Sequence, residues 1–432
     1  MTVVREKVTL SGTIKAPPSK SLTQRAIACA VLAEGQSCIR ASSLCADALS
    51  ALGVARSLGA VVDRQSEWIS IRGSPLFNEF AGEFSGRFDG KNGIPIDLDC
   101  GESGLCMRMF SPIAALLPVN TRLLASGSLS ARPMAMIEKP LRNLGADCRT
   151  TGGKAPVAIR GPMRGGALTM DAGGSSQLLT GLLLALPLAQ EDSEILAQGT
   201  VSRGYLDLTI ASAKTFGVRI ERDDDYSRFR IAGRQRYKVV EYEVEGDWSS
   251  AAFLVVAATL ASSKEGLLIR GLNRDSQQPD KAVLDAVSAA GAFFEFDHGG
   301  LRIGRTALHP FSFNATNCPD LFPPLAALAS ACPGISEIKG LSRLRGKESD
   351  RAASLMAMLR SLGIESEIQN DSLRIHGGDP LGGTVEAWGD HRIAMAAAVA
   401  ALAAKNPVFI DGAECVAKSW PDFFEDMDSL QA

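Results

Sequence analysis

The chain has 432 residues, of which 46% are apolar and 22% are charged, and this composition is typical of a globular protein rather than a disordered or fibrous one. Its 45 basic and 48 acidic residues give a net charge of −3, which argues against broad electrostatic binding to nucleic acid or to an acidic membrane surface. The longest apolar stretches run about a dozen residues, well short of the roughly 20 that a membrane helix needs. We therefore expect two or three domains, no nucleic-acid partner and no membrane association.

The first twelve residues alternate like a strand and carry charges where a secretion signal would be apolar, so we expect a cytoplasmic protein. Nine cysteines are scattered along the chain without a C-x-x-C pair. The four histidines lie far apart, and no H-E-x-x-H helix is present. These patterns predict neither structural disulfides nor a metal site.

Amphipathic segments that end in an apolar residue, a glycine and a small or branched apolar residue recur along the chain. They end at residues 58–60, 144–146, 216–218, 290–292 and 362–364, and the glycines Gly145, Gly217, Gly291 and Gly363 lie 72, 74 and 72 residues apart. The residue after a helix often takes a left-handed conformation that only glycine adopts without strain. The period predicts repeated surface helices, each ended by its glycine.

A second series of segments, apolar on nearly every side, alternates with the first. Small polar or charged residues open these segments near Ser19, Ser103, Ser175, Asp247, Asp320 and Asp390. Because a helix that is apolar all round must be surrounded by protein, we expect six buried helices with short strands between them. The pattern predicts an α/β fold of six units, each with one buried and one surface helix, grouped in two compact lobes.

The expected domain boundaries follow from composition. The charged, strand-like segment 235–245 separates two units, and Pro17 and Pro18 precede the first buried helix. We expect one lobe at residues 19–235 and a second at residues 1–18 plus 236–432. The segments 17–19 and 235–245 are the predicted hinges between them.

Cationic residues gather at the predicted helix starts. They are Lys20, Arg25, Arg108, Arg132, Arg203, Lys347, Arg351, His391, Arg392 and Lys418. A helix amino terminus carries unpaired N–H groups and a partial positive charge, which suit phosphate or carboxylate. Single serines and aspartates at such positions are ordinary caps, but cations that recur at one phase of the repeat predict a ligand with several negative groups.

The sequence resembles the enolpyruvylshikimate phosphate synthase family, whose members are also called phosphoshikimate carboxyvinyltransferases. The resemblance covers almost the whole chain and rests on the stretches at 19–25 (SKSLTQR), 131–134 (ARPM), 173–177 (GGSSQ), 201–217 (VSRGYLDLTIASAKTFG), 245–252 (EGDWSSAA), 318–320 (CPD), 346–351 (GKESDR), 389–395 (GDHRIAM) and 417–424 (AKSWPDFF). It implies a two-lobed inside-out α/β barrel, with three βαβαββ repeats around buried parallel helices in each lobe. The active site would lie in the cleft between the lobes.

The resemblance also implies a reaction: transfer of the enolpyruvyl group of phosphoenolpyruvate to the 5-hydroxyl of shikimate 3-phosphate, with release of phosphate and without a metal or organic cofactor. Separately, we expect the protein to be a monomer. The residues that would bind phosphoenolpyruvate are Lys20, Gly104, Arg132, Gln177, Arg351, Arg392 and Lys418. Those that would bind shikimate 3-phosphate are Ser21, Arg25, Ser175, Ser176, Gln177, Ser202, Tyr205, Asp320 and Lys347.

The same resemblance implies the catalytic roles. Asp320 would be the base for the attacking hydroxyl, and Glu348 would protonate the methylene carbon. These two proton transfers give a tetrahedral intermediate, which then expels phosphate. Lys347 and Arg351 flank Glu348 in the sequence and favour its ionised form, so Lys20 or Lys418 is an alternative proton donor. One segment departs from the family pattern: Glu102 and Leu105 stand where an asparagine and a threonine are usual, whereas Gly104 and Arg108 are kept.

Two other functions remain to be weighed. The sister transferase that acts on UDP-N-acetylglucosamine carries a cysteine acid five residues before its Arg-Pro pair, where this chain has Gly127. A non-catalytic protein that binds phosphorylated metabolites is the second alternative. The presence of Lys20, Asp320, Glu348 and Lys418 argues against it.

Overall fold

The structure is a computed structural model that describes residues 1–78, 94–304 and 307–431. The chain divides into two compact units. The central unit comprises Lys20–Val244, and the terminal unit, which holds both chain ends, comprises Met1–Ser19 and Glu245–Ala432. Each unit has a hydrophobic core of its own.

The central unit contains three four-stranded sheets with the orders β14-β3-β5-β4, β6-β7-β9-β8 and β10-β11-β13-β12. The strands are β3 (Gln36–Arg40), β4 (Val61–Gln65), β5 (Trp68–Arg72), β6 (Ile96–Asp99), β7 (Asn120–Leu124), β8 (Asp147–Thr151), β9 (Lys154–Arg160), β10 (Gly166–Asp171), β11 (Ser193–Gln198), β12 (Glu221–Arg222), β13 (Arg228–Ile231) and β14 (Glu241–Glu243). The helices are α1 (Lys20–Leu32), α2 (Ala46–Ser57), α3 (Pro75–Asn78), α4 (Gly104–Ala114), α5 (Glu138–Asn143), α6 (Gln177–Ala185) and α7 (Arg203–Thr215), with 3-10 turns η3 (Gly127–Ala131), η4 (Ala135–Ile137) and η5 (Leu186–Leu188).

The terminal unit contains two four-stranded sheets, β16-β17-β15-β2 and β18-β19-β21-β20, and a three-stranded sheet, β1-β23-β22. The strands are β1 (Thr2–Arg5), β2 (Leu10–Lys15), β15 (Ser262–Arg270), β16 (Phe293–Asp297), β17 (Gly300–Gly304), β18 (Ser312–Asn314), β19 (Gly334–Lys339), β20 (Glu365–Gln369), β21 (Ser372–Gly377), β22 (Gly383–Glu386) and β23 (Val408–Asp411). The helices are α8 (Trp248–Ala261), α9 (Val283–Ala289), α10 (Phe322–Ala331), α11 (Arg351–Ser361), α12 (His391–Ala401) and α13 (Phe423–Asp428), with 3-10 turns η6 (Pro279–Ala282), η7 (Pro319–Leu321), η8 (Leu341–Leu344) and η9 (Ala413–Lys418).

The four-stranded sheets share one topology. In the sheet of β6 to β9, β6 pairs in parallel with β7, β9 lies antiparallel to β7, and β8 lies antiparallel to β9. With α4 between β6 and β7 and α5 before β8, this is a βαβαββ repeat. In the sheet of β3 to β5, the strand that pairs in parallel with β3 is β14, from the end of the central unit. In the sheet of β15 to β17, the strand that pairs in parallel with β15 is β2, from the start of the chain. The predicted α/β fold of βαβαββ repeats is confirmed.

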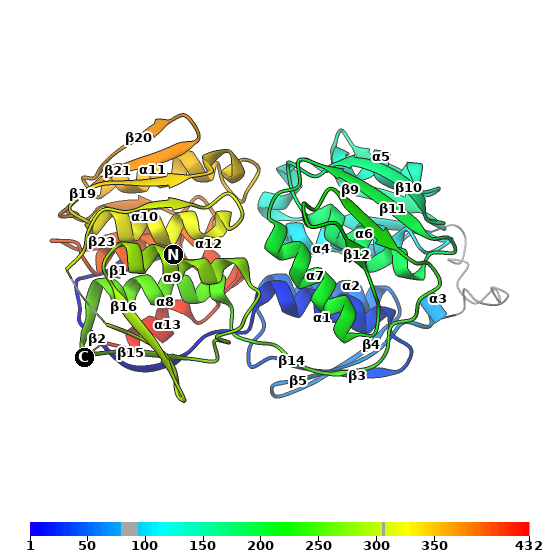
Figure 1. Ribbon diagram of the computed structural model, residues 1–432, viewed down its shortest axis with the longest axis horizontal. Coiled ribbons are helices and arrows are strands. Elements are labelled where there is room, and N and C mark those ends of the chain that lie inside the picture. Colours follow the sequence, from blue (N-terminus) through cyan, green and yellow to red (C-terminus); the bar gives the residue numbers. More distant parts are fainter. Residues whose placement is uncertain (79–93, 305–306, 432) are drawn as a thin grey trace. The chain divides into compact units, whose positions relative to one another are not determined.

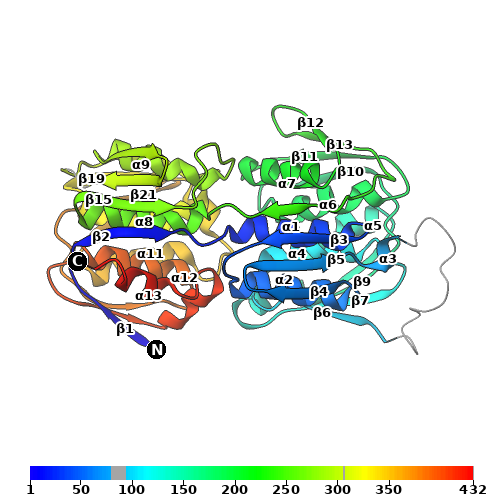
Figure 2. The same ribbon diagram turned by 90° about the horizontal axis from the view of Figure 1, so that it is seen from below.

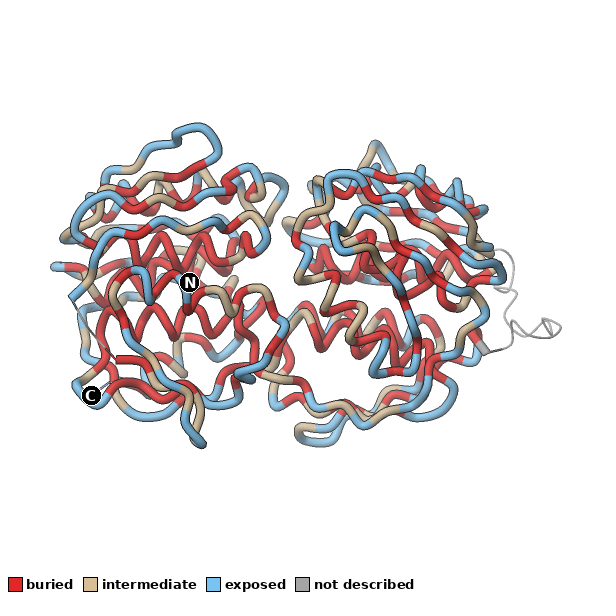
Figure 3. The backbone as a smooth tube through the Cα atoms, in the orientation of Figure 1, coloured by how far each residue is buried: buried red, intermediate tan, exposed pale blue. Residues whose placement is uncertain are grey.

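The predicted buried helices are confirmed as well. All residues of α4, α8 and α12 are buried, and Figure 3 shows such helices as continuous red coils inside each unit. The helices α1, α4 and α6 lie inside the sheets of the central unit, and α8, α10 and α12 inside those of the terminal unit (Figure 1, Figure 2). Among the described residues, no helix combines the length and the apolar character that a bilayer crossing requires.

Glycine ends the surface helices as the sequence predicts. Residues Gly59, Gly145, Gly217, Gly291 and Gly363 follow α2, α5, α7, α9 and α11 and have φ values of 88°, 95°, 84°, 98° and 74°. After α11, the Gly363 N–H donates to the Arg360 carbonyl and the Ile364 N–H to the Leu359 carbonyl, so the last turn of the helix is satisfied.

The chain changes unit at Ser19/Lys20 and at Val244/Glu245, which differs from the expected boundaries at Ser19, now in the terminal unit, and at residues 236–244, now in the central unit. Residues 236–244 belong to the central unit for two reasons. Strand β14 pairs in parallel with β3. Tyr237 is 2% exposed and its hydroxyl donates to the Leu184 carbonyl at 2.8 Å. The charged residues of this segment suggested a linker, but its alternate side chains complete a sheet and a core.

Candidate active site

In the central unit, the predicted site residues lie at the amino-terminal ends of helices. Lys20, Gly104 and Gln177 are the first residues of α1, α4 and α6, and Ser202 is the N-cap residue of α7. Helix starts of this kind present N–H groups and partial positive charge to an anion. Because a helix starts at the same point of each repeat, several predicted site residues occupy equivalent helix ends.

Gly104 lies against two guanidinium groups. A Cβ atom at this position would lie 2.8 Å from Arg132 Nη1 and 2.9 Å from Arg108 Nη1, so any larger residue would push these guanidinium groups away. Arg108 also donates from Nη1 to Gln177 Oε1 at 2.7 Å, which joins α4 to α6. Two neighbouring cations repel each other, and a phosphate or carboxylate would relieve that repulsion.

Arg25 of α1 connects this helix to α7 in the central unit. It is 2% exposed and donates to the Thr209 hydroxyl at 2.9 Å, the Ser21 carbonyl at 2.9 Å and the Tyr205 carbonyl at 3.1 Å. Burial lowers the pKa of Arg25 to about 10, which still leaves it charged at neutral pH. These bonds fix the backbone of Ser21 and Tyr205, two residues predicted to bind shikimate 3-phosphate.

The remaining predicted residues of this unit lie close to those ends. The Ser175 hydroxyl accepts from the Gln177 N–H at 3.2 Å, and Ser176 is the N-cap residue of α6. Ser202 has a left-handed φ of 54° although it is not glycine, and this kind of strain is often found at functional sites. Lys20 pairs with Asp47, with 3.1 Å between Nζ and Oδ2. Asp47 was not singled out from the sequence.

Arg203 and Glu102, which the sequence singled out, contact residues outside the predicted site. The guanidinium of Arg203 lies over the Tyr226 ring, 5.3 Å from its centroid. The Glu102 carboxylate accepts from the Ser128 N–H at 3.1 Å and from the Ser128 hydroxyl at 2.9 Å, and a Cβ at Gly127 would overlap it. Glu102 therefore ties the loop before α4 to η3, which precedes Arg132.

In the terminal unit, three cations converge on Asp320. Its carboxylate accepts from Lys347 Nζ at 3.2 Å, Arg351 Nη1 at 3.1 Å and Arg392 Nη2 at 3.1 Å. Burial alone would raise the pKa of Asp320, but Arg392, Lys347 and Arg351 hold it well below its ordinary value. Burial lowers the pKa of Lys347. Residues from the regions of η7, α11 and α12 thus meet at one carboxylate.

Arg351 is the most enclosed member of this group, with a side chain only 1% exposed. It donates to Glu348 Oε2 at 2.5 Å and to both oxygens of Asp390, at 2.8 and 3.1 Å. Burial alone would lower the pKa of Arg351, but the carboxylates of Asp390, Glu348 and Asp320 raise it above its ordinary value. Lys418 Nζ lies 3.8 Å from Glu348 Oε1, so this lysine and this carboxyl group are neighbours.

Asp390 is a second residue that the sequence did not assign to the site. It is fully buried, caps α12 by accepting from the Arg392 N–H at 3.1 Å, and holds Arg351. Its position at the start of a buried helix marked it as a cap, but the ion pair with Arg351 joins residues far apart in the chain. Sequence spacing carries no signal for such a pair.

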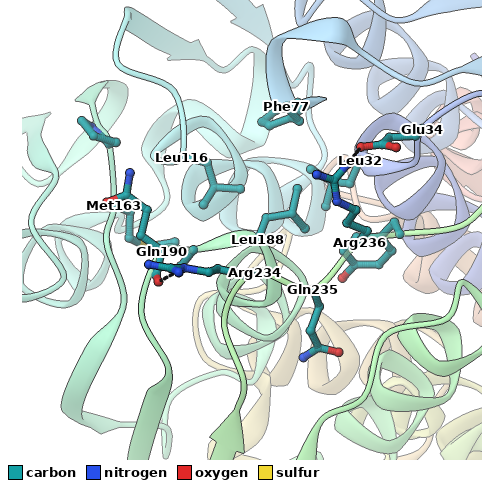
Figure 4. Close-up of a pocket in the computed structure, with 13 residues that line it drawn as sticks. Leu32, Glu34, Phe77, Leu116, Met163, Leu188, Gln190, Arg234, Gln235 and Arg236 are labelled. Atoms are coloured by element: carbon teal, nitrogen blue, oxygen red, sulfur yellow. Dashed lines mark hydrogen bonds and ion pairs between the residues drawn. The ribbon is translucent and has the colours of Figure 1, made fainter. Parts of the chain in front are cut away.

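A cavity of about 540 Å³ lies elsewhere in the central unit (Figure 4). Leu32, Leu116 and Leu188 line it, so it lies beyond the carboxyl-terminal ends of α1, α4 and α6, and Arg234 and Arg236 also line it. None of the predicted site residues lines this cavity. The candidate site is therefore defined by its charged side chains and helix starts rather than by this cavity.

Solved structures with this fold include EPSP synthase from Acinetobacter baumannii, with a TM-score of 0.80 and 26% identity over 100% of this chain and 98% of that one. The enolpyruvyl transferase NikO from Streptomyces tendae has a TM-score of 0.74 and 18% identity, over 99% of this chain and 97% of that one. At that identity the second likeness bears on the fold alone.

Comparison of sequences extends the likeness along the chain. The 3-phosphoshikimate 1-carboxyvinyltransferase of Methanosarcina mazei is 37% identical over 435 residues, which are 99% of this chain and 97% of the relative. The enzyme of the same name from Clostridium botulinum (strain Alaska E43) is 34% identical over 427 residues, 98% of this chain and 95% of the relative. The family model of EPSP synthase (3-phosphoshikimate 1-carboxyvinyltransferase) matches residues 4–427. This chain belongs to the EPSP synthase family.

Proposed function

We propose that this protein is a 3-phosphoshikimate 1-carboxyvinyltransferase: it transfers the enolpyruvyl group of phosphoenolpyruvate to the 5-hydroxyl of shikimate 3-phosphate and releases phosphate. The observation that carries the proposal is the group around Asp320, where a partly buried carboxylate is held by three cations beside Glu348 and Lys418. Within a family of this activity, such a group supplies a base, an acid and anion-binding side chains together. The match of the family model over residues 4–427 supports this proposal over UDP-N-acetylglucosamine transfer.

The assignment of binding residues follows the two units. Shikimate 3-phosphate is bound chiefly by the central unit, through Ser21, Arg25, Ser175, Ser176, Gln177, Ser202 and Tyr205, with Asp320 and Lys347 from the terminal unit. Phosphoenolpyruvate is bound by Lys20, Gly104, Arg132 and Gln177 of the central unit and by Arg351, Arg392 and Lys418 of the terminal unit. Both substrates are polyanions that repel each other, and fixed cations from both units offset that repulsion.

The chemistry needs one proton removed and one delivered. Asp320 takes the proton of the 5-hydroxyl as its oxygen attacks C2 of phosphoenolpyruvate, and Glu348 protonates the C3 methylene to give a tetrahedral intermediate. Loss of a C3 proton then expels phosphate and leaves the enol ether. Lys418 Nζ lies 3.8 Å from Glu348 Oε1, and this lysine is the alternative proton donor.

The cations around Asp320 give substrate binding a second effect. While Lys347, Arg351 and Arg392 are bonded to Asp320, its carboxylate is a weak base. Substrate phosphate and carboxylate groups compete for the same donors, so their binding releases Asp320 and strengthens it as a base. The base therefore becomes effective when both substrates are present.

The test is a coupled phosphate-release assay with phosphoenolpyruvate and either shikimate 3-phosphate or UDP-N-acetylglucosamine as the acceptor. We expect turnover with shikimate 3-phosphate only. Turnover with the nucleotide sugar, or binding of both substrates without phosphate release, would contradict the proposal. We further propose that the protein acts in the cytoplasm as a monomer, and light scattering at micromolar concentration tests its oligomeric state.

A further inference from the structure

One buried glutamine holds both places where the chain passes between the units. Gln278 precedes η6 in the terminal unit and is 6% exposed. Its side-chain oxygen accepts from the Ser19 hydroxyl and from the Trp248 N–H, each at 3.1 Å. Its amide nitrogen donates to Glu245 Oε1 and to the Gly246 carbonyl, each at 2.8 Å. One side chain therefore makes four bonds to the two crossings.

This set of partners requires a side chain with an acceptor and a donor, which the amide of Gln278 supplies. The Trp248 N–H can only donate, and the Gly246 carbonyl can only accept, so the group between them must present an acceptor on one side and a donor on the other. These two partners also fix which atom of Gln278 is oxygen and which is nitrogen. A carboxylate of the same shape would keep the acceptor side and lose the donor side.

The crossings that Gln278 joins are also paired directly. The Ser19 N–H donates to the Glu245 carbonyl at 2.9 Å, and the Asp247 N–H donates to the Pro17 carbonyl at 2.7 Å. The chain enters the central unit directly after Ser19 and leaves it directly before Glu245. We call Gln278 and the residues it joins at the two crossings the clamp. The clamp ends at the unit boundary on both crossings, and Lys20 is the next residue after Ser19.

We propose that Gln278 is a positioning residue for enolpyruvyl transfer. Gln278 holds Ser19 and Glu245 in the terminal unit, so the backbone can rotate only beyond these two residues. It thereby fixes the point from which α1 starts, at Lys20. This inference rests on the proposed function, in which phosphoenolpyruvate contacts Lys20 of the central unit and Arg351, Arg392 and Lys418 of the terminal unit. Shikimate 3-phosphate, bound chiefly by the central unit, depends much less on that placement.

The test uses the full chain with Gln278→Glu, which removes the two donated bonds and places a carboxylate beside Glu245. We expect the KM for phosphoenolpyruvate to rise about tenfold and kcat to fall, because a small misplacement of a binding group is costly. The dissociation constant of shikimate 3-phosphate alone should stay within about twofold of the parent value. Loss of stability by itself does not produce that split between the two substrates.

Ser336→Ala is the matched control. Ser336 is fully buried in the same unit and accepts from the Phe311 N–H at 3.2 Å, so its loss also leaves a buried polar group unsatisfied, away from the crossings. It should lower the melting temperature without changing the KM for phosphoenolpyruvate. Ser19→Ala, which removes one bond to Gln278, should raise that KM by a smaller factor and decides the matter if Gln278→Glu does not fold.

The inference fails if Gln278→Glu and Ser19→Ala leave the KM for phosphoenolpyruvate unchanged, or if Ser336→Ala raises it equally. Absence of phosphate release by the parent protein has a different meaning, because it contradicts the proposed function and not the clamp.

Discussion

Arg351 organises the charged side chains of the terminal unit. Its guanidinium bonds to Asp320, Glu348 and Asp390, and a planar group with five N–H donors can serve three carboxylates where a lysine cannot. Burying such charges costs free energy, so a group of this kind is better explained by function than by stability. With Lys347, Arg392 and Lys418 nearby, cations outnumber carboxylates and the group favours an anionic ligand.

The role of Glu348 leads to a first prediction. Glu348→Gln keeps a hydrogen-bonding side chain beside Arg351 but removes the transferable proton. General acid catalysis contributes about 100-fold or more, so kcat should fall at least about tenfold in the phosphate-release assay. Glu365→Gln changes an exposed glutamate of β20 in the same unit and should leave kcat unchanged. If Glu348→Gln turned over like the parent, Glu348 would not be the proton donor, and Lys20 or Lys418 would take that role.

The low pKa of Asp320 leads to a second prediction. A carboxyl group whose pKa is depressed in the folded protein stabilises it above the unfolded value of about 3.9, and that contribution is lost as the pH falls through the folded pKa. Asp320→Asn should therefore have a lower melting temperature than the parent at pH 7, and the difference should shrink below about pH 4.

Asp224→Asn, at an exposed position of the central unit, serves as the control and should follow the parent across that range. A difference between Asp320→Asn and the parent that is constant from pH 7 to acid would show that the carboxylate is not held by its three cations.

The sequence predicted cations near helix starts, and the structure places Arg351 and Arg392 at the starts of α11 and α12, with Lys347 in the loop before α11. Their roles stay predictions. The sequence did not predict Asp47, Asp390 or Gln278, since each acts through a contact between distant parts of the chain. Local patterns describe a helix start but not the group that faces it.

Helix ends determine where the functional residues of each element lie. In the surface helices a left-handed glycine stops the helix and turns the chain into the next strand, and Gly145 does so after α5 with a φ of 95°. A Cβ at Gly145 would meet nothing closer than 3.8 Å, so its requirement is for backbone conformation alone. Gly53, inside α2, has open space around a Cβ and no positive φ.

These two glycines give opposite predictions. Gly145→Ala forces a left-handed alanine and should destabilise the protein by about 1 kcal/mol. Gly53→Ala should stabilise it by about 0.5–1 kcal/mol, because alanine loses less entropy in a helix. Urea unfolding of both variants measures the difference, and effects of the same sign would contradict the assigned conformations.

Close packing of α4 on α6 leads to a prediction that joins structure to activity. A Cβ at Gly181 would lie 2.6 Å from the Met109 carbonyl oxygen and 2.8 Å from that of Arg108, so Gly181→Ala must push the two helices apart. That movement strains the Arg108–Gln177 bond at the helix starts. The kcat/KM for phosphoenolpyruvate should fall at least about tenfold.

Gly53→Ala is the control for this variant, since it adds the same methyl group to a helix of the same unit without a clash. An unchanged kcat/KM in Gly181→Ala, together with a normal melting temperature, would mean that the helix spacing does not set the position of Gln177.

The elements themselves were more predictable than their boundaries. The period of about 72 residues identified the helices because each repeat must satisfy the same packing. It did not identify residues 236–244 as part of the central unit. There, β14 gains its place by pairing with β3, about 200 residues earlier in the chain, and no local pattern reports such pairing.

In the sequence, the central unit is one continuous segment inserted between the two parts of the terminal unit. The central unit occupies residues 20–244 without interruption, and all its buried core residues come from that range. The terminal unit is assembled from both chain ends, and its core joins Leu10 and Ile14 of β2 to residues of α8 and later helices. Because each core is complete in itself, each unit satisfies the main requirement for independent folding.

This division predicts that binding and turnover can be separated. A fragment of residues 20–244 should fold and bind shikimate 3-phosphate, more weakly than the full chain because Asp320 and Lys347 are missing, and should show no turnover. The terminal unit can be made by joining Ser19 to Glu245 through a short glycine linker, since the Ser19 N–H lies 2.9 Å from the Glu245 carbonyl.

Mixed at micromolar concentration, the two fragments should give far less phosphate release than the intact chain, because two covalent crossings supply an effective concentration that free fragments lack. Calorimetry with shikimate 3-phosphate and the phosphate-release assay measure the two effects. The central fragment with Gly181→Ala, in which α4 and α6 are pushed apart, is the control that shows whether binding depends on correctly placed helix starts. A well-folded central fragment without affinity for shikimate 3-phosphate would contradict the assignment of Ser21, Ser176 and Tyr205 to that substrate.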